Sequence, residues 1–272
     1  MRVNSRFVRG APWVKNMAYC GISVLALAVV LGSTAGISSA GEIGKWGGAI
    51  DPDALQVLKG MTDYLGGLEQ FSMHTENTYE DVLETGQKFQ FAFSSDIVVQ
   101  RPDRLLVERT DGIVDHLFVY DGETLSTYHA EDGFFAIISA PDNLDDLLHF
   151  ARDTLDQVPP AGDMLFTNSF ELLTANVTSG IVVGQAVVDG VVCHHIAFTT
   201  PLVDWQVWVA DGDMPLPYKY VLTTKDDPAQ PQFVTWLSNW EIAVEIEGGT
   251  FIFEAPENGM EIDYLVVDTA GR

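Results

Sequence analysis

The sequence predicts an α+β fold in which one large antiparallel sheet holds most of the chain and a few helices pack on it. Short runs of β-branched and aromatic residues recur along the chain, and Gly, Pro and Asp-Gly pairs separate them. Two longer stretches instead place apolar residues at helical spacing. Because no internal repeat or linker divides the chain, we expect a single domain whose sheet of about ten strands is large enough to curl.

Two stretches carry the helical pattern. Asp51 can cap the first helix, Pro52 suits its first turn, and Gly66-Gly67 ends it. The second helix, at 143–158, places Leu and Ala on one side and Asp and Arg on the other. A less regular helix is expected at 164–174, where Asn, Thr and Ser lower the helical propensity.

The strands follow from alternation and from turn signals. Phe89, Phe91 and Phe93 alternate with polar or small residues and therefore share one face of a strand. Asp121-Gly122 is a strong hairpin turn between two apolar runs. The expected strands cover residues 71–79, 88–93, 105–109, 116–120, 125–129, 134–139, 181–188, 193–198, 205–209, 218–222, 232–246 and 251–253.

The N-terminus has the pattern of a secretory signal. Arg2 and Arg9 belong to a basic start, an apolar run follows at 22–31, and Ser39 and Ala40 are the small residues of a cleavage site. The alternative is an uncleaved anchor helix, but this run is short for a membrane span. We expect cleavage after about Ala40, export to the periplasm and no stable membrane span thereafter. The expected organisation is a signal peptide at 1–40, a flexible lead-in at 41–50, one domain at 51–266 and a tail at 267–272.

The charge of the chain restricts its partners. The sequence has 39 Asp and Glu against 14 Lys and Arg, a net charge of −25 at pH 7. Such a charge repels the phosphates of nucleic acid and disfavours docking on anionic lipid surfaces, although it is also consistent with adaptation to a habitat. After the signal only Cys193 remains, so no internal disulfide can form and the fold must rest on its core. We expect a monomer with no nucleic-acid partner.

The stretch 191–224 concentrates large aromatic side chains. It has the pattern of a β-meander, and Trp205, Val207 and Val209 lie on one face of its middle strand by the two-residue period. Tyr218, Tyr220 and Leu222 share one face of the next strand in the same way. An aromatic surface of this size requires either a packed core or a bound apolar molecule, and the sequence leaves both open.

Several motifs, in this order, resemble the periplasmic lipoprotein localisation factors, the LolA/LolB-like superfamily. Residues 100–105 contain the Arg-Pro pair before a hydrophobic strand, and 117–125 with Tyr128 match the next hairpin. Residues 250–259 match the closing Phe-x-Phe, Pro and Gly pattern. The stretch 205–218 is closest to a subgroup of predicted periplasmic proteins of unknown function within that superfamily.

The resemblance implies an incomplete β-barrel whose concave apolar face is covered by helices and holds acyl chains. It also implies that Arg101 is a lid switch, which holds the helices closed by hydrogen bonds. The expected ligand is a lipid, a lipoprotein acyl chain or another apolar molecule. The residues expected to line its cavity are Phe89, Phe91, Phe93, Leu105, Val107, Phe118, Tyr120, Trp205, Val207, Tyr218, Tyr220, Trp236 and Trp240.

Other functions have weaker support in the sequence. In Cys193-His194-His195 at most two side chains can converge on one face of a strand, and no second Cys or His cluster completes a zinc site. Asp211-Gly212-Asp213 lacks the spaced acidic ligands of a calcium loop. We therefore expect no enzyme activity, no metal and no cofactor. The first alternative is a ligand-free module that binds another envelope protein, and a less favoured one is a hydrolase or metal enzyme that uses His194 or His195.

Overall fold

The computed structural model describes residues 48–155 and 161–264. The expected signal peptide, most of the lead-in, the Pro159-Pro160 helix stop and the C-terminal tail lie outside the described residues. Among the residues that are described, no helix is long and apolar enough to cross a membrane.

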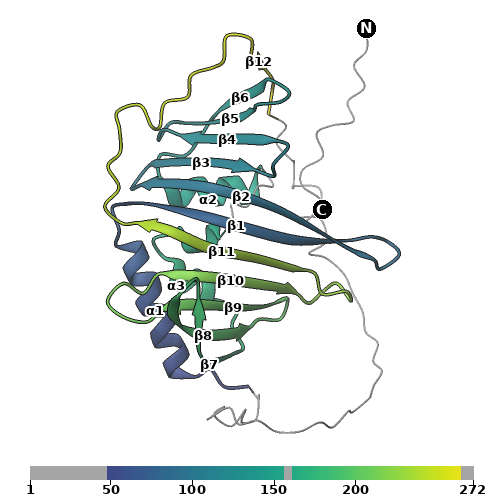
Figure 1. The fold of residues 1–272 in the computed structure, drawn as a ribbon, viewed down its shortest axis with the longest axis vertical. Coiled ribbons are helices and arrows are strands. Elements are labelled where there is room, and N and C mark those ends of the chain that lie inside the picture. The colour runs from purple at the N-terminus through teal and green to yellow at the C-terminus, as the bar shows by residue number, and fades with distance from the viewer. Residues whose placement is uncertain (1–47, 156–160, 265–272) are drawn as a thin grey trace.

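The expected α+β fold is confirmed: the molecule is built on one 12-stranded sheet that is antiparallel except where β12 joins β6 (Figure 1). The order across the sheet is β12-β6-β5-β4-β3-β2-β1-β11-β10-β9-β8-β7. The strands are β1 (Gln70–Val82), β2 (Lys88–Gln100), β3 (Arg104–Thr110), β4 (Asp115–Tyr120), β5 (Thr124–His129), β6 (Phe134–Ser139), β7 (Ser179–Val188), β8 (Val191–Thr199), β9 (Val203–Ala210), β10 (Pro217–Thr224), β11 (Gln232–Glu241) and β12 (Met260–Glu261).

The sheet consists of two meanders joined by one long-range pairing. Strands β1 to β6 follow one another in chain order from the centre of the sheet toward the β12 edge, and β7 to β11 run from the other edge to the centre. The pairing of β1 with β11, from Ser72 with Glu241 to Tyr79 with Phe233, connects the two halves. Strands β12 and β7 stand at the two ends of the order, so the sheet is not closed.

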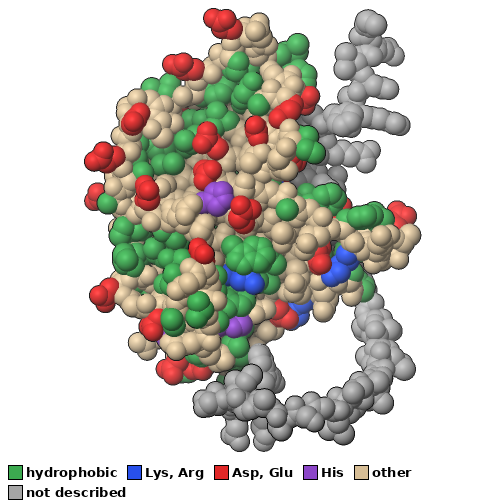
Figure 2. Space-filling view, in the orientation of Figure 1, with side chains coloured by type: hydrophobic (Ala, Val, Ile, Leu, Met, Phe, Trp, Pro, Cys, Tyr) green, Lys and Arg blue, Asp and Glu red, His purple; other side chains and the backbone are tan. Residues whose placement is uncertain are grey.

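The helices lie together on one side of the sheet, behind it in the view of Figure 1. We call this side the inner face and the opposite side the outer face. The helical elements are α1 (Pro52–Gly66), α2 (Leu144–Asp153), the 3-10 turn η2 (Gly162–Met164) and α3 (Ser169–Thr174). The side chain of Asp51 caps α1 by accepting a hydrogen bond from the Asp53 amide at 2.9 Å, as expected. The outer face carries scattered acidic side chains and few basic ones (Figure 2).

A single apolar core lies between the inner face and the helices. The helix α1 contributes Leu58, Met61 and Leu65, which are fully buried at the spacing of one helical stripe. The segment from α2 to α3, which we call the lid (described at 143–155 and 161–174), adds a second apolar layer. Its core residues are Leu144, Leu147, Leu148, Leu155, Ala161, Met164, Leu165, Phe166 and Leu173.

The structure differs from the expectation at several elements. The helix expected at 143–158 ends at Asp153, and the helix expected at 164–174 is split into η2 and α3. The strand expected at 88–93 continues to Gln100, and β12 was not expected. The strand expected at 232–246 ends at Glu241. No strand forms at 251–253; this irregular segment lies on the outer face instead, where Phe253 contacts Tyr128 and Phe135 with ring centroids 6.4 Å and 5.7 Å away. Contacts of these side chains replace the backbone ladder that the alternation of 251–253 had suggested.

Candidate functional site

The register of the central strands arranges the inner face in rows. One row is apolar and runs from Val107 through Ile97 to Met73 on β3, β2 and β1. Two rows with polar members follow, and then a row in which Phe91, Tyr79, Phe233, Leu222 and Trp205 are neighbours on β2, β1, β11, β10 and β9. Since neighbouring side chains in a row lie only about 5 Å apart, the first and last of these rows are continuous apolar or aromatic bands, and the two between them mix polar and apolar side chains.

On β8 to β10 the inner aromatic residues fill a core. Trp205 stacks on Phe198 with ring centroids 4.4 Å apart and meets Tyr220 edge-on at 6.1 Å. All three side chains are at most 3% exposed, and Val207 beside them is fully buried. The helix α1 lies over this half and contacts β7, β8 and β9. In this half the large aromatic surface of 191–224 is therefore a packed core.

Toward the far end of β1 and β2 the aromatic residues are exposed instead. Phe89 and Phe91 are 44% and 46% exposed, whereas Phe93, further along the same face of β2, is only 9% exposed. Phe91 stacks on Tyr79 with ring centroids 5.3 Å apart. The predicted alternation of the three phenylalanines is confirmed by the register, but only the last of them is buried, against Tyr79 and Arg109. This exposed group of Phe89, Phe91 and Tyr79, which we call the mouth, leads into the buried rows.

The lid is tied to the sheet by a small set of polar contacts near the start of β3. The guanidinium of Arg101 donates a hydrogen bond from Nη2 to the backbone carbonyl of Leu165 at 2.7 Å. Asp145 of α2 accepts hydrogen bonds from the backbone amide and the hydroxyl of Thr167. The amide of Leu144 donates to the carbonyl of Pro102 at 2.8 Å. The Arg101 and Pro102 contacts hold Leu165 and the start of α2 against one turn of the sheet, and the Asp145 contacts join α2 to Thr167 within the lid.

Arg101 itself is only partly satisfied. Its Nε and Nη1 atoms are buried and have no hydrogen-bond partner. Burial lowers the pKa of its guanidinium, and the charge of Asp145 acts in the opposite direction. This partly buried cation has two nitrogens without a partner and is held by a single direct hydrogen bond to the lid.

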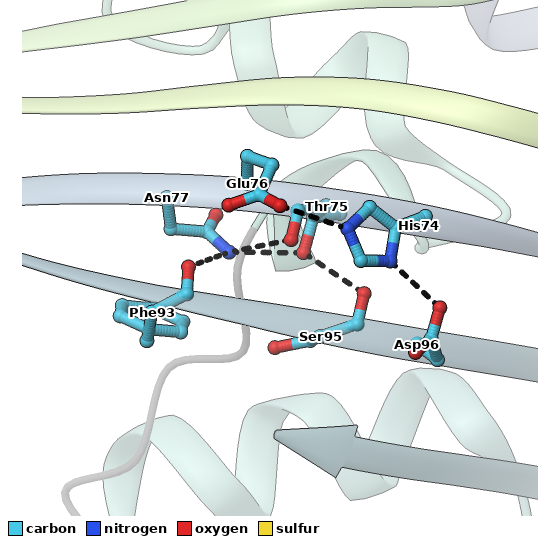
Figure 3. A network of polar contacts seen from close by, with 7 residues as sticks. All are labelled: His74, Thr75, Glu76, Asn77, Phe93, Ser95 and Asp96. Carbon is cyan, nitrogen blue, oxygen red and sulfur yellow. Dashed lines mark hydrogen bonds and ion pairs between the residues drawn. The ribbon is translucent and has the colours of Figure 1, made fainter. Parts of the chain in front are cut away.

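A group of small polar side chains interrupts the apolar inner face. Four of these side chains are at most 1% exposed: Thr75 and Asn77 on β1, Ser95 on β2 and Thr235 on β11. They belong to the two neighbouring rows with polar members, and we call the four together the polar row. Ser95 is the register partner of Thr75, and Thr235 is the register partner of Asn77. The Asn77 amide donates to the Thr75 hydroxyl at 2.9 Å and to the Phe93 carbonyl at 3.3 Å (Figure 3). The oxygens Asn77 Oδ1, Ser95 Oγ and Thr235 Oγ1 have no partner.

The remaining predicted lining residues lie on the inner face with one exception. Leu105, Val107 and Tyr120 are buried there, and Phe118 is half-buried beside them. Burial raises the pKa of Tyr120 to about 12, and its hydroxyl donates to the carbonyl of Pro141 at the start of the lid. Tyr218 and Trp240 are half-buried against the core.

Trp236 is the exception. It pairs with Glu76 and Lys219 on the outer face and is 38% exposed, with the Lys219 amine 5.0 Å from the centre of its ring. Alternation along the sequence would place it with Trp240, but Asn239 adopts a left-handed φ of 51° within a bulge of the β1–β11 pairing. The extra residue reverses the side of the sheet, so Trp240 packs on Phe71 of the inner face.

Cys193, His194 and His195 do not converge. Cys193 is buried and its thiol pKa is raised by that burial. His194 contacts Asp211 at 3.1 Å, whereas His195 contacts Gln206 at 2.9 Å and stacks on Trp208 of the outer face. In 48–155 and 161–264, no group of three or more His, Cys, Asp or Glu side chains is placed to hold a metal ion.

Sequence reasoning missed one cluster beside the mouth. The Arg109 guanidinium lies 3.9 Å from the ring centre of Phe93, and the His116 and His129 rings are 3.9 Å apart. Burial lowers the pKa of His116 to about 4, and the charges of His129 and Arg109 contribute in the same direction. The three basic residues come from β3, β4 and β5, so only the strand register brings them together.

Two shallow hollows flank α1. One of about 430 Å³ is lined by Val57, His194, Val209 and Asp211, and one of about 510 Å³ is lined by Leu55, Lys59 and Phe170 of α3. Neither is lined by a residue of the mouth.

Comparison with solved structures gives similar folds at low sequence identity. The lipoprotein LppX of Mycobacterium tuberculosis is 17% identical over 72% of this chain and 100% of its own, with a TM-score of 0.45. LprF of Mycobacterium bovis is 16% identical over 74% and 99%, also with a TM-score of 0.45. A LolA superfamily protein of Nitrosomonas europaea is 12% identical over 73% and 96%, with a TM-score of 0.33.

Comparison with curated protein sequences gives no match. The family described as "Predicted periplasmic protein (DUF2092)" matches residues 54–265, which is most of the chain and nearly all of the described structure. This confirms the expected resemblance to a group of predicted periplasmic proteins. The chain belongs to the DUF2092 family of predicted periplasmic proteins.

Proposed function

We propose that this protein is an exported, non-enzymatic binding protein that holds a lipid, a lipoprotein acyl chain or a similar apolar ligand between the inner face and the lid. One observation carries the proposal. The aromatic band of the inner face begins at the exposed mouth, where Phe89 and Phe91 are 44% and 46% exposed, and continues along its row to the buried Trp205. An apolar surface that is half open and half covered suits a ligand that enters from the open end.

Burial of an acyl chain supplies enough free energy for such binding. Each methylene removed from water contributes about 0.8 kcal/mol, so a chain with ten buried methylenes gains roughly 8 kcal/mol before ordering costs. The lid must move to admit it, because the core residues of the lid already pack on the inner face. The proposed ligand therefore competes with the lid for the same apolar surface.

Arg101 is the proposed switch of this movement. It reaches from the sheet to the Leu165 carbonyl, and the free Nε and Nη1 atoms offer no other internal hold. A contact of this kind can open without unfolding the sheet, because the polar contacts of the lid are few. The lid would close by the same contact after the ligand has left or has been fully enclosed.

The direct test is to find the ligand. The mature protein is purified from its own cell envelope without detergent, and native mass spectrometry and lipid extraction identify the bound mass. We expect a co-purifying lipid or acyl species, and fluorescent acyl probes should bind to the emptied protein. A folded protein that is consistently empty and ignores acyl probes would refute the proposal and favour an envelope protein-interaction module.

A variant of the mouth locates the site. Phe89→Ser combined with Phe91→Ser removes the exposed aromatic surface, and we expect acyl-probe affinity to fall at least tenfold. The matched control is Ile113→Ser, which removes an 81% exposed apolar side chain in the turn between β3 and β4. Equal effects of the two changes would contradict entry at the mouth.

A further inference from the structure

The polar row places buried polar side chains on an otherwise apolar surface, where binding of a purely apolar ligand would not require them. Its members are buried on three adjacent strands, with apolar rows on either side. Asn77 and Thr235 are at most 1% exposed, as is Ser95, yet Asn77 Oδ1, Thr235 Oγ1 and Ser95 Oγ lack any partner. A buried polar group without a hydrogen bond costs about 1–3 kcal/mol, so three of them are a substantial cost in the closed state.

The orientation of the Asn77 amide is fixed by its neighbours. Its nitrogen donates to the Thr75 hydroxyl and to the Phe93 carbonyl, and the Thr75 hydroxyl donates to the Ser95 carbonyl at 3.4 Å. Reversal of the amide would bring its oxygen against the Phe93 carbonyl oxygen. Figure 3 shows the amide nitrogen turned toward Phe93 and Thr75. The oxygen Asn77 Oδ1 is therefore a hydrogen-bond acceptor without a donor.

We infer that the polar row binds an uncharged hydroxyl or amide N–H group carried by the apolar ligand. This rests on the proposed function and defines the class of ligand: an amphiphile with a hydrogen-bond donor within its apolar part, such as a fatty alcohol, a hydroxylated acyl chain or an acyl amide. A hydroxyl can donate to Asn77 Oδ1 while its oxygen accepts from Ser95 Oγ or Thr235 Oγ1. A hydrocarbon or a simple ester supplies no donor and leaves Asn77 unsatisfied.

An anionic group fits the polar row poorly. The open oxygen of Asn77 would face the anion, and the nearest guanidinium in the same row, that of Arg109, is turned onto the ring of Phe93. Asp163 of η2 lies close enough for its charge to affect Tyr220, the register neighbour of Thr235. A carboxylate or phosphate would lose its hydration at this position without a cation to replace it.

The experiment compares two probes of which only one has a hydrogen-bond donor. Oleyl alcohol and methyl oleate have the same unsaturated tail and differ in the head group, a hydroxyl against a methyl ester. Their affinities are measured by displacement of a fluorescent acyl probe from the emptied full-length mature protein. We expect oleyl alcohol to bind at least tenfold more tightly than methyl oleate. In Thr235→Val and Asn77→Leu this preference should fall to less than threefold, with methyl oleate bound as in the wild type or more tightly.

The controls separate hydrogen bonding from folding. Thr78→Val and Ser94→Ala make the same kind of change on the outer face of β1 and β2, next to Asn77 and Ser95, and should keep the full preference. Thr235→Val should leave the thermal unfolding midpoint unchanged or higher, because it removes an unpartnered buried hydroxyl.

The outcomes distinguish this inference from the proposed function. Tight binding of both probes with equal affinity overturns the inference and leaves the proposed function in place. Binding of neither probe overturns both. A preference that persists in Thr235→Val and Asn77→Leu, or a lower unfolding midpoint for Thr235→Val, shows that the polar row serves the fold alone and also overturns the inference.

Discussion

The two halves of the sheet use similar aromatic sequences in different ways. On β8 to β10, Phe198, Trp205 and Tyr220 are stacked and buried beneath α1. On β1 and β2, the corresponding surface changes along each strand from exposed aromatics through the polar row to buried aliphatics. The surface of β8 to β10 is a packed core, whereas that of β1 and β2 has exposed rings and polar atoms without hydrogen-bond partners. The difference predicts that stability is concentrated in one half and that the proposed ligand binds to the other.

The largest expected effect comes from a residue of this packed core. Trp205→Ala leaves a cavity among Phe198, Tyr220 and Leu222 and should lower the free energy of unfolding by about 3–5 kcal/mol. Phe91→Ala in the mouth removes a ring that is 46% exposed and should cost less than about 1 kcal/mol. Urea denaturation followed by tryptophan fluorescence and by circular dichroism measures both. Similar costs at the two sites would remove the distinction between the halves.

The second prediction concerns the attachment of the lid. Arg101→Met removes the hydrogen bond to Leu165 but also removes two unpartnered buried nitrogens, so the global cost should be only about 1–2 kcal/mol. The local effect should be larger, with faster amide hydrogen exchange confined to residues 161–174. Hydrogen exchange with mass spectrometry distinguishes local opening of the lid from global unfolding.

The same turn of the sheet offers the control for this experiment. Arg104→Met removes a partly exposed arginine that pairs with Asp103 at 3.0 Å and does not contact Leu165. It should leave exchange in the lid unchanged. Faster exchange in the lid of Arg104→Met, or unchanged exchange in Arg101→Met, would contradict a specific role of Arg101.

Local patterns in the sequence predicted most of the elements and part of the site. The helix α1 begins after Asp51 and ends at Gly66-Gly67, as expected, and the apolar spacing of 143–158 located α2. These two features depend on residues close in sequence, where propensity and capping determine the outcome. Arg101 was expected only from the family resemblance, and its hydrogen bond to Leu165 joins residues 64 positions apart.

The features that escaped prediction depend on register between distant strands. Trp236 lies on the outer face because one left-handed residue, Asn239, reverses the alternation within β11. The polar row arises because β11 pairs with β1 in one register, which places Thr235 beside Asn77. Isolated Thr, Ser and Asn residues in strands ordinarily face solvent, so nothing in the local sequence marked them as buried.

The third prediction tests the basic cluster beside the mouth. The pKa of His116 is lowered to about 4, so between about pH 4 and its ordinary value of 6.5 the unfolded chain binds a proton that the folded protein excludes. Stability should therefore fall as the pH decreases through this window. His116→Gln should reduce this loss by on the order of 1 kcal/mol, less than the full shift because the ring is partly solvated.

Urea denaturation at pH 7, 6, 5 and 4.5 measures this effect. The charged and titratable residues that act on the imidazole must stay unchanged in both proteins; these are Arg109, His129, Asp111 and Glu131. The control is Thr127→Ala, which alters the register partner of Phe118 without changing a titrating group. If wild type and His116→Gln lose stability in parallel as the pH falls, His116 is not excluded from protonation in the folded state.

The smallest expected effect is on the outer face of the same strand that carries the polar row. His74 contacts Asp96 at 2.7 Å and Glu76 at 3.2 Å (Figure 3). Burial by itself lowers the pKa of His74, but the hydrogen bonds and charges of Asp96 and Glu76 outweigh it and raise the pKa. Unlike Asn77, this side chain is fully partnered and faces water, so it should contribute to stability rather than to binding.

The sign of its pH dependence is opposite to that of His116. Because the pKa of His74 is raised in the folded state, its contribution is complete below about pH 6.5 and is lost as the pH rises through the folded pKa. His74→Gln should cost about 0.2–1 kcal/mol at pH 5.5 and nothing at pH 8.5, and 0.5 M NaCl should reduce the cost. Asp96→Asn combined with Glu76→Gln should remove the same pH dependence, and affinity for acyl probes should stay as in the wild type in every one of these variants. A change in affinity would mean that the outer face of β1 takes part in binding, and the division between its inner and outer polar groups would no longer hold.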